Sequence, residues 1–152
     1  MEYINYASYG SNLNLQSMAL MTPNAKCIDK GYLKDYKLVF HSGLADIIEE
    51  EGSFVPVAIY KIPKQEIKNV DRYEGYPRLY HKIKKDIKVL NKDKTINCMI
   101  YKMQEKGLSL VPPNTSYYET IKQGYEDWKL ENLDYYLKKA LVESMQSQKG
   151  VI

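Results

Sequence analysis

The sequence has few residues of the kinds that build disulfide frameworks, metal sites and membrane spans. Its two cysteines, Cys27 and Cys98, and its two histidines, His41 and His81, stand isolated in the chain. Two cysteines make no disulfide framework, and no Cys/His spacing matches a zinc site. No apolar run approaches the ~20 residues needed to cross a bilayer, and no signal peptide opens the chain. We therefore expect a reducing, cytoplasmic setting with no metal site and no membrane partner.

A strong excess of charge is also lacking. The chain carries 22 basic and 19 acidic residues, a net charge of +3 that is spread evenly. Such a mild balance argues against a nucleic-acid partner. The lysine-rich stretches 82–88 and 92–94 are expected to be solvated strand edges, where lysines discourage aggregation. Phenylalanine is scarce, with 2 residues against 15 tyrosines. Because tyrosine joins apolar area to a hydroxyl, some of these rings are expected to line a polar cavity.

A chain of 152 residues with 44% apolar residues predicts one folded domain. We place the domain at residues 1–145 and predict a frayed C-terminal tail at 146–152. Strands and helices alternate without a regular βαβ rhythm. This pattern predicts an α+β fold with a small mixed, mostly antiparallel sheet, closed like a barrel and flanked by helices. Nothing in the sequence specifies an oligomeric state.

Alternating and apolar segments predict the strands, and helical stripes with capping residues predict the helices. The segment 49–53 (Glu-Glu-Glu-Gly-Ser) is interpreted as a charged turn. The pair Ser116 and Glu119 has the spacing of a capping box that opens a helix. The predicted strands are 1–9, 25–40 (one or two strands), 43–48, 54–62, 80–90 and 95–103, and the predicted helices are 13–21, 64–74, one from 116 and one from 132.

The first strand is followed by Gly10-Ser11-Asn12, which breaks it. Glycine tolerates positive φ and asparagine visits the left-handed region, so such a turn can aim consecutive N–H groups at one point. A helix beginning near Leu13 would add its N-terminal dipole to the same point. The functional interpretation is a loop that binds a carboxylate or phosphate. The alternative is a strand-to-helix turn that binds nothing.

Glu74 is the one carboxylate that the pattern places toward the core. In a helix over 64–74, Ile67, Val70 and Glu74 share a face, because they are spaced by three and seven residues. Glu74 also lies in the last turn, where the dipole disfavours an anion, and Asp71 adds a like charge. All three effects raise a carboxylate pKa, and such a group serves as a general base or acid near neutrality. The alternative is a surface ion pair of Glu74 with Arg72 or Arg78.

Taken together, two segments carry a family resemblance. They read Tyr6-Ala-Ser-Tyr-Gly-Ser-Asn-Leu13 and Asp71-Arg-Tyr-Glu-Gly-Tyr-Pro-Arg-Leu-Tyr80. In this order they resemble the γ-glutamylcyclotransferase family, the AIG2-like group. The likeness continues through 31–36, 43–45 and 112–117 and covers roughly residues 3 to 137. One departure is Val57, which stands where many members have glycine.

The resemblance implies the reaction and the residues that carry it. The α-amine of a γ-glutamyl compound attacks its own γ-carbonyl, closing 5-oxoproline and releasing an amine or amino acid. This is an acyl-transfer or lyase-type cyclisation that needs no cofactor, with Glu74 as the acid/base. Tyr80 and Tyr117 match tyrosines that line the family's pocket. The loop that offers backbone N–H groups to the substrate corresponds to Tyr9, Gly10, Ser11, Asn12 and Leu13.

Two other functions stay open at the level of sequence, because one fold hosts many functions. The first is a non-catalytic module that binds a small molecule and retains the loop. The second is a related acyl-processing enzyme that uses the same glutamate on a modified metabolite or a side-chain amide. Tyr117 also has a simpler interpretation, because the helical stripe from Tyr117 to Trp128 is typical of core packing.

Overall fold

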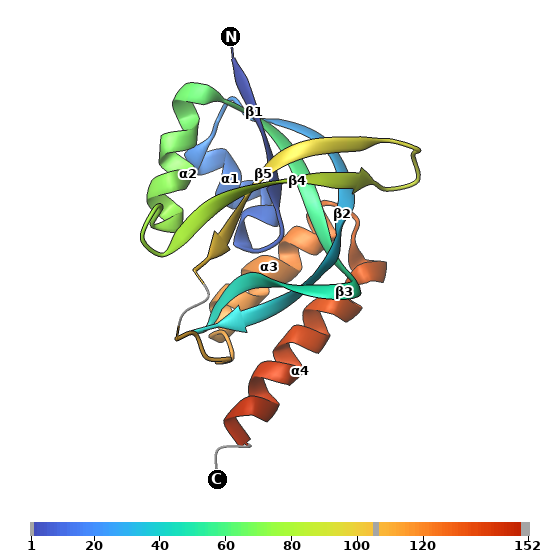
Figure 1. The fold of residues 1–152 in the computed structure, drawn as a ribbon. Helices are drawn as coiled ribbons and strands as arrows, with labels where there is room; N and C mark the ends of the chain where they lie inside the picture. Colours follow the sequence, from blue (N-terminus) through green and yellow to red (C-terminus); the bar gives the residue numbers. More distant parts are fainter. Residues whose placement is uncertain (1, 105–106, 150–152) are drawn as a thin grey trace.

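The computed structural model describes residues 2–104 and 107–149, whose strands form a closed barrel (Figure 1). The order around the barrel is β1-β3-β2-β4-β5, and β1 and β5 meet in parallel while the other neighbours are antiparallel. This confirms the predicted α+β fold with a mostly antiparallel, barrel-like sheet. The strands are β1 (Tyr3–Ser8), β2 (Lys26–His41), β3 (Leu44–Pro63), β4 (Tyr80–Val89) and β5 (Thr95–Met103).

Strand β1 closes the barrel. It pairs with β3 from Tyr3↔Pro63 to Ser8↔Ala58 and meets β5 at Tyr6↔Met99. The chain leaving β1 therefore emerges between two neighbours that come much later in the sequence. The core is built from apolar side chains of all five strands, among them Ala7, Phe40, Ile47, Ile59, Ile87 and Ile100, which are fully buried.

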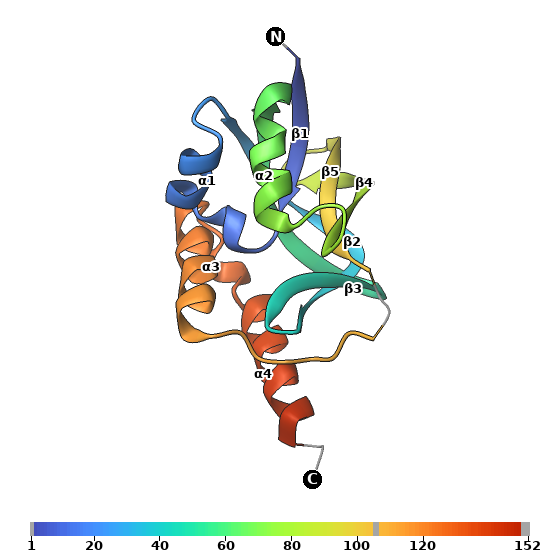
Figure 2. The ribbon, with the colours of Figure 1, turned by 90° about the vertical axis from the view of Figure 1, so that its left-hand side faces the viewer.

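Four helices flank the barrel, and α4 forms the end of the molecule opposite the N-terminus (Figures 1 and 2). Gly124 of α3 packs directly on the turn after β1. A Cβ atom at this glycine would lie 2.4 Å from the Leu13 Cβ, so a larger residue would push the helix off the turn. The helices are α1 (Leu15–Met21), α2 (Ile67–Glu74), α3 (Thr115–Asp127) and α4 (Tyr135–Lys149), and the 3-10 turns are η1 (Ser11–Leu13), η2 (Lys64–Glu66) and η3 (Glu131–Leu133).

The predicted turn at 49–53 is wrong, because β3 runs through it as one strand. The pairing with β2 jumps from Lys34↔Phe54 to Tyr36↔Glu49, which leaves residues 50–53 bulged out opposite Asp35. Gly52 has φ 85° and donates its N–H to the Asp35 carboxylate over 2.9 Å. The positive φ and this hydrogen bond let the strand bend without ending. The hairpin reverses instead at Ser42 and Gly43.

Two helix ends also differ from the prediction. Asn114, not Ser116, caps α3, because its side-chain oxygen accepts the Tyr117 N–H over 2.7 Å. Helix α4 continues to Lys149, past residue 145 where the domain was expected to end. Residues 146–149 thus extend a helix, and the rest of the predicted frayed tail, 150–152, lies outside the described residues. None of the helices within the described ranges has both the length and the apolar character of a membrane span.

Candidate active site

Glu74 is the last residue of α2, and the geometry of that helix end aims it inward. Val70, one turn earlier, is fully buried, so the face that it shares with Glu74 lies on the barrel. Gly75 then ends the helix in the left-handed conformation with φ 67° and donates its N–H to Arg72. Tyr76 donates to Asp71 O, completing a Schellman-type end. This end holds the Glu74 side chain partly buried rather than free in water.

The turn after β1 differs in detail from the predicted loop. Neither Gly10 nor Asn12 has a positive φ. Gly10 has φ −121° and ψ −134°, and a Cβ atom there would lie 3.1 Å from the Ala45 Cβ. Glycine is therefore favoured by the close approach of β3, rather than by a left-handed backbone.

Three consecutive N–H groups of this turn, those of Gly10, Ser11 and Asn12, donate to no acceptor among the described residues. The N–H of Leu13 is already used, because it donates to Gly10 O over 3.0 Å. Because η1 is a 3-10 turn, closing it uses the Leu13 hydrogen, so Leu13 is not among the free N–H donors of the turn. The free donors available to an anion or carbonyl oxygen are the three that precede it.

Helix α1 adds less to this turn than predicted. It begins at Leu15, and the N–H groups of Leu15 and Ser17 in its first turn donate to side chains of the protein. Asn14 Oδ1 accepts the Ser17 N–H over 2.9 Å, and Asp127 Oδ2 accepts the Leu15 N–H over 2.9 Å. These side chains cap the helix end. The donors of η1 therefore act without the N-terminus of α1.

The turn and the glutamate meet through Asn12. Its Nδ2 donates to Glu74 Oε1 over 3.0 Å and to the Tyr6 hydroxyl over 2.9 Å. Burial raises the pKa of Glu74 to about 7, and the hydrogen bond from Asn12 lowers it in part. Within the described residues, Glu74 forms no ion pair with Arg72 or Arg78. The predicted surface pairing is thus not what the structure contains.

The expected contribution of Asp71 to this pKa is absent. The causes of the raised Glu74 pKa are burial and, in opposition, Asn12. Asp71 faces elsewhere: it accepts the Tyr101 hydroxyl over 2.5 Å and pairs with Lys82 Nζ at 2.9 Å. A cation beside Asp71 balances its charge, so it does not act as an uncompensated neighbour of Glu74.

Tyrosines form the walls around the glutamate. The Tyr80 hydroxyl donates to Ala45 O over 2.7 Å, and the Tyr117 hydroxyl accepts the Ala45 N–H over 3.0 Å. One residue of β3 thus fixes both rings through its backbone. The Tyr9 hydroxyl donates to Tyr101 O over 2.7 Å. Burial raises the pKa of all three phenols above the usual range, so they stay neutral.

One pocket gathers most of the residues singled out by sequence. Leu13 alone lies outside it, fully buried against α3. The pocket residues predicted from sequence are Tyr9, Gly10, Ser11, Asn12, Glu74, Tyr80 and Tyr117. The residues that sequence reasoning did not assign to it are Tyr6, Ala7, Ser8, Ala45 and Tyr101. Of these, Tyr6 and Ser8 are two residues apart in β1 and so lie on one face of the strand. This spacing was the signal in the sequence that could have grouped them.

Val57, the departure from the family pattern, does not line this pocket. It is fully buried in β3 and lies opposite Gly31 of β2. A Cβ atom at Gly31 would lie 2.2 Å from Lys88 O of β4. The glycine that permits close packing of strands in this part of the barrel is therefore on the neighbouring strand.

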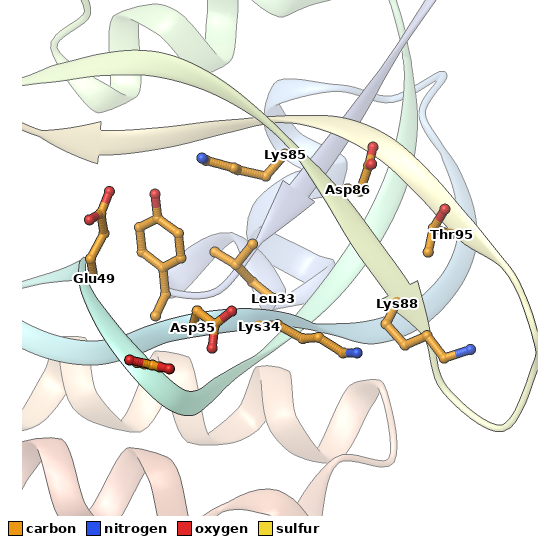
Figure 3. Close-up of a pocket in the computed structure, with 10 residues that line it drawn as sticks. Leu33, Lys34, Asp35, Glu49, Lys85, Asp86, Lys88 and Thr95 are labelled. Atoms are coloured by element: carbon orange, nitrogen blue, oxygen red, sulfur yellow. The ribbon is translucent and has the colours of Figure 1, made fainter.

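A second hollow lies between the bulged β2–β3 hairpin and β4 (Figure 3). It is lined by charges of both signs, and Lys85 Nζ lies 5.6 Å from the centre of the Tyr36 ring. Its carboxylates, on Asp35, Glu49, Glu51 and Asp86, are all exposed. None is desolvated as Glu74 is, so the Glu74 pocket is the better candidate for proton transfer. No cluster of three metal-ligating side chains occurs within 2–104 and 107–149.

Comparison with known proteins agrees with this geometry. The family described as "Gamma-glutamyl cyclotransferase, AIG2-like" matches residues 6–130. A gamma-glutamylcyclotransferase of Bos taurus is 29% identical over 134 residues, 80% of this chain and 70% of the relative. That of Homo sapiens is 29% identical over 151 residues, 91% of this chain and 78% of the relative. A solved structure described as gamma-glutamyl cyclotransferase superposes with a TM-score of 0.81 at 27% identity, covering 92% of this chain and 88% of that one.

Proposed function

This chain belongs to the AIG2-like γ-glutamyl cyclotransferase family, and we propose that it converts a γ-glutamyl compound into 5-oxoproline and a free amine or amino acid. The single observation that carries the mechanism is the partly buried Glu74, hydrogen-bonded by Asn12 and with a pKa raised to about 7. Relatives that share the family carry the name of this activity.

Glu74 moves the proton in this mechanism. The α-ammonium group of the substrate first gives a proton to the Glu74 carboxylate, so that the nitrogen lone pair is free. The amine nitrogen then bonds to the γ-carbon and the bond from that carbon to the leaving nitrogen breaks. Glu74 returns this proton to the leaving nitrogen. The attacking nitrogen loses a second proton as it becomes the ring amide, and Glu74 passes that proton to the expelled amine, which leaves as an ammonium group. A carboxyl group with a pKa near neutrality is suited to both transfers.

We assign the η1 turn to stabilising the oxygen of the substrate's γ-carbonyl group. Attack on the γ-carbonyl places negative charge on its oxygen, and backbone N–H groups aimed at that atom lower the barrier. The free donors of Gly10, Ser11 and Asn12 lie in the same pocket as Glu74, so they are the donors we assign to substrate oxygens. Ring closure also needs a bent γ-glutamyl chain, and we assign Tyr80 and Tyr117 to holding it, because their hydroxyls are fixed on Ala45.

The alternative of a binding module without turnover is disfavoured by Glu74. A carboxylate that served only to bind a cationic group would work best fully ionised, whereas burial raises the pKa of Glu74 to about 7 and leaves it partly protonated near neutral pH. A catalyst gains a base near neutral pH. We also infer a reducing, cytoplasmic setting, which the two free thiols of Cys27 and Cys98 support.

The test is a panel of γ-glutamyl amino acids and γ-glutamyl amines, assayed for 5-oxoproline with purified protein. We expect the wild type to form 5-oxoproline from at least one member, and Glu74→Gln to fold and form none above background. If no member of the panel yields 5-oxoproline with the wild type, the proposed function is overturned. If Glu74→Gln turns over substrate at the wild-type rate, the role of Glu74 is overturned instead.

A further inference from the structure

Two buried oxygen atoms in the Glu74 pocket have no hydrogen-bond partner among the described residues. They are Ser8 Oγ and Asn12 Oδ1. Ser8 is 2% exposed and Asn12 is 1% exposed, so bulk water does not reach either side chain freely. Buried polar atoms in native proteins are almost always paired, because an unpaired one costs free energy. Two such atoms in one pocket indicate that the pocket is completed by a ligand.

These atoms lie around a single hydroxyl, that of Tyr6. Asn12 Nδ2 donates to it. Burial and then the charge of Glu74 raise the pKa of this hydroxyl, while Asn12 and the nearby Ser8 lower it. Ser8 does not complete a hydrogen bond to Tyr6, however, because its Oγ has no partner of acceptable geometry. Ser8, Asn12 and Glu74 therefore lie in one pocket around the Tyr6 hydroxyl, so they can together border a small group bound beside that hydroxyl.

The free atoms beside this hydroxyl favour a donor, because Asn12 Oδ1 and the Glu74 carboxylate can only accept and the Ser8 hydroxyl can also accept. Both N–H hydrogens of the Asn12 amide are committed, one to Tyr6 and one to Glu74, so only its carbonyl oxygen remains. Glu74 uses Oε1 for Asn12 and keeps Oε2. Ser8 offers the lone pairs of its hydroxyl. Three acceptors beside one hydroxyl match the three N–H donors of an ammonium group, whereas the free N–H groups of η1 match substrate oxygens.

We propose that Ser8 Oγ and Asn12 Oδ1, together with Glu74, form a subsite for the α-ammonium group of the substrate, and that Ser8 is a specificity-determining residue. This inference rests on the proposed function and deepens it. Two fixed acceptors beside the base hold the nitrogen while Glu74 removes one proton. The lone pair that results is then directed at the γ-carbonyl, rather than rotating freely.

The experiment uses two ligands that differ only in the amine. The substrate is γ-glutamyl-alanine, and the probe is glutaryl-alanine, which lacks the α-amine, cannot cyclise and is measured as a competitive inhibitor. The variants are Ser8→Ala and Ser8→Cys. The matched control is Ser144→Ala, because Ser144 is fully buried in α4 and its hydroxyl donates to Leu141 O, outside the pocket.

For Ser8→Ala we expect kcat/KM for γ-glutamyl-alanine to fall 10- to 100-fold, the range for losing a hydrogen bond to a charged group. The inhibition constant for glutaryl-alanine should stay within about twofold of wild type, since no contact to that probe is lost. Ser8→Cys should lie between Ser8→Ala and wild type, because a thiol is a weak acceptor. The Tm of Ser8→Ala should be no lower than that of wild type, since the hydroxyl has no partner to lose.

The possible outcomes separate this inference from the proposed function. If the wild type is active and Ser8→Ala has unchanged kcat/KM, the ammonium subsite is overturned and the cyclotransferase function stands. If Ser8→Ala weakens the substrate and glutaryl-alanine equally, Ser8 does not read the amine and the inference is again overturned. If the wild type itself forms no 5-oxoproline from any γ-glutamyl compound, the proposed function fails.

Discussion

Asn12 Nδ2 lies 3.0 Å from Glu74 Oε1 and donates a hydrogen bond to it, joining the turn after β1 to the end of α2. The same amide also binds the Tyr6 hydroxyl, so the strand, the turn and the helix are held at one point. Asn12 therefore holds the carboxylate in position and lowers its pKa, against the larger effect of burial, which raises it. The predictions below depend on that contact or on the packing around it.

The rate should depend on the ionisation of Glu74. Because burial raises the pKa of Glu74 to about 7, kcat/KM should fall about tenfold per pH unit well below that value. Above it, the carboxylate is ionised and this limb of the profile should level off. Initial rates of 5-oxoproline formation from pH 5 to 8.5 measure the limb. A profile that stays flat down to pH 5 would contradict the assignment of Glu74 as the base.

Removing the Asn12 amide should shift the acid limb of the kcat/KM profile to higher pH. The hydrogen bond from Asn12 lowers the pKa of Glu74, so Asn12→Ala leaves burial unopposed. We expect the midpoint of the acid limb to shift to higher pH, and kcat/KM at pH 6 to fall more than at pH 8.5. Asn69→Ala is a control, because Asn69 also donates a side-chain hydrogen bond, to Met21 O, without touching Glu74. An equal loss at both pH values would instead indicate a purely structural defect.

Glu74 should also make stability depend on pH. The ordinary pKa of a glutamate is 4.5 and burial raises that of Glu74 to about 7 in the fold, so between these values the folded state binds more protons than the unfolded state. The free energy of unfolding of wild type, relative to Glu74→Gln, should therefore fall as pH rises from about 4.5 to 7. The total change should be about 2–3 kcal/mol. Urea titrations of both proteins at pH 4, 6 and 8 would reveal a constant difference if the pKa were unshifted.

Gly10 should tolerate alanine only if β3 makes room. A Cβ atom at residue 10 would crowd the Ala45 Cβ at 3.1 Å, and Ala45 holds Tyr80 and Tyr117. We expect Gly10→Ala to cost about 1–3 kcal/mol of stability and at least tenfold in kcat/KM. The double variant Gly10→Ala/Ala45→Gly removes the Ala45 Cβ atom that the new side chain would contact. It should recover part of the lost stability and part of the lost kcat/KM. Strictly additive losses in this cycle would show that the two positions do not interact.

The Tyr117 hydroxyl should contribute to both the stability of the fold and the binding of substrate. It accepts the N–H of Ala45, so Tyr117→Phe leaves that part-buried donor unpaired. We expect a loss of about 1–3 kcal/mol in the free energy of unfolding and a raised KM for the γ-glutamyl substrate. Tyr135→Phe serves as the control, because Tyr135 is 55% exposed on α4. Equal effects of the two substitutions on KM would argue against a positioning role for Tyr117.

The fold class and the inward direction of Glu74 could be predicted because they follow from local periodicity. The spacing of Ile67, Val70 and Glu74 fixes their common face in any regular helix. The contacts of Asp71 could not be predicted in this way. Its partners Tyr101 and Lys82 belong to strands that come near Asp71 only in the folded barrel. The loss of the Leu13 donor likewise follows from a 3-10 turn that no residue pattern distinguishes from other turns.

The segment 49–53 shows a second limit of sequence. Three glutamates followed by Gly52 have the composition of a turn, yet Asp35 on the facing strand binds the Gly52 N–H and keeps the two strands together. A bulge and a reversal use the same residue types, and the choice between them is made across the sheet.

Closure of the barrel by its first strand has a consequence for how the protein is made. Strand β1 leaves the ribosome first, but its neighbours β3 and β5 follow only with residues 44–63 and 95–103. During translation β1 has both edges unpaired until β3 emerges, and the edge that faces β5 stays unpaired until residues 95–103 follow and the barrel can close. A chaperone that shields short aromatic strands, or a slowly translated stretch after residue 103, would therefore act on the yield of folded protein without touching the finished molecule.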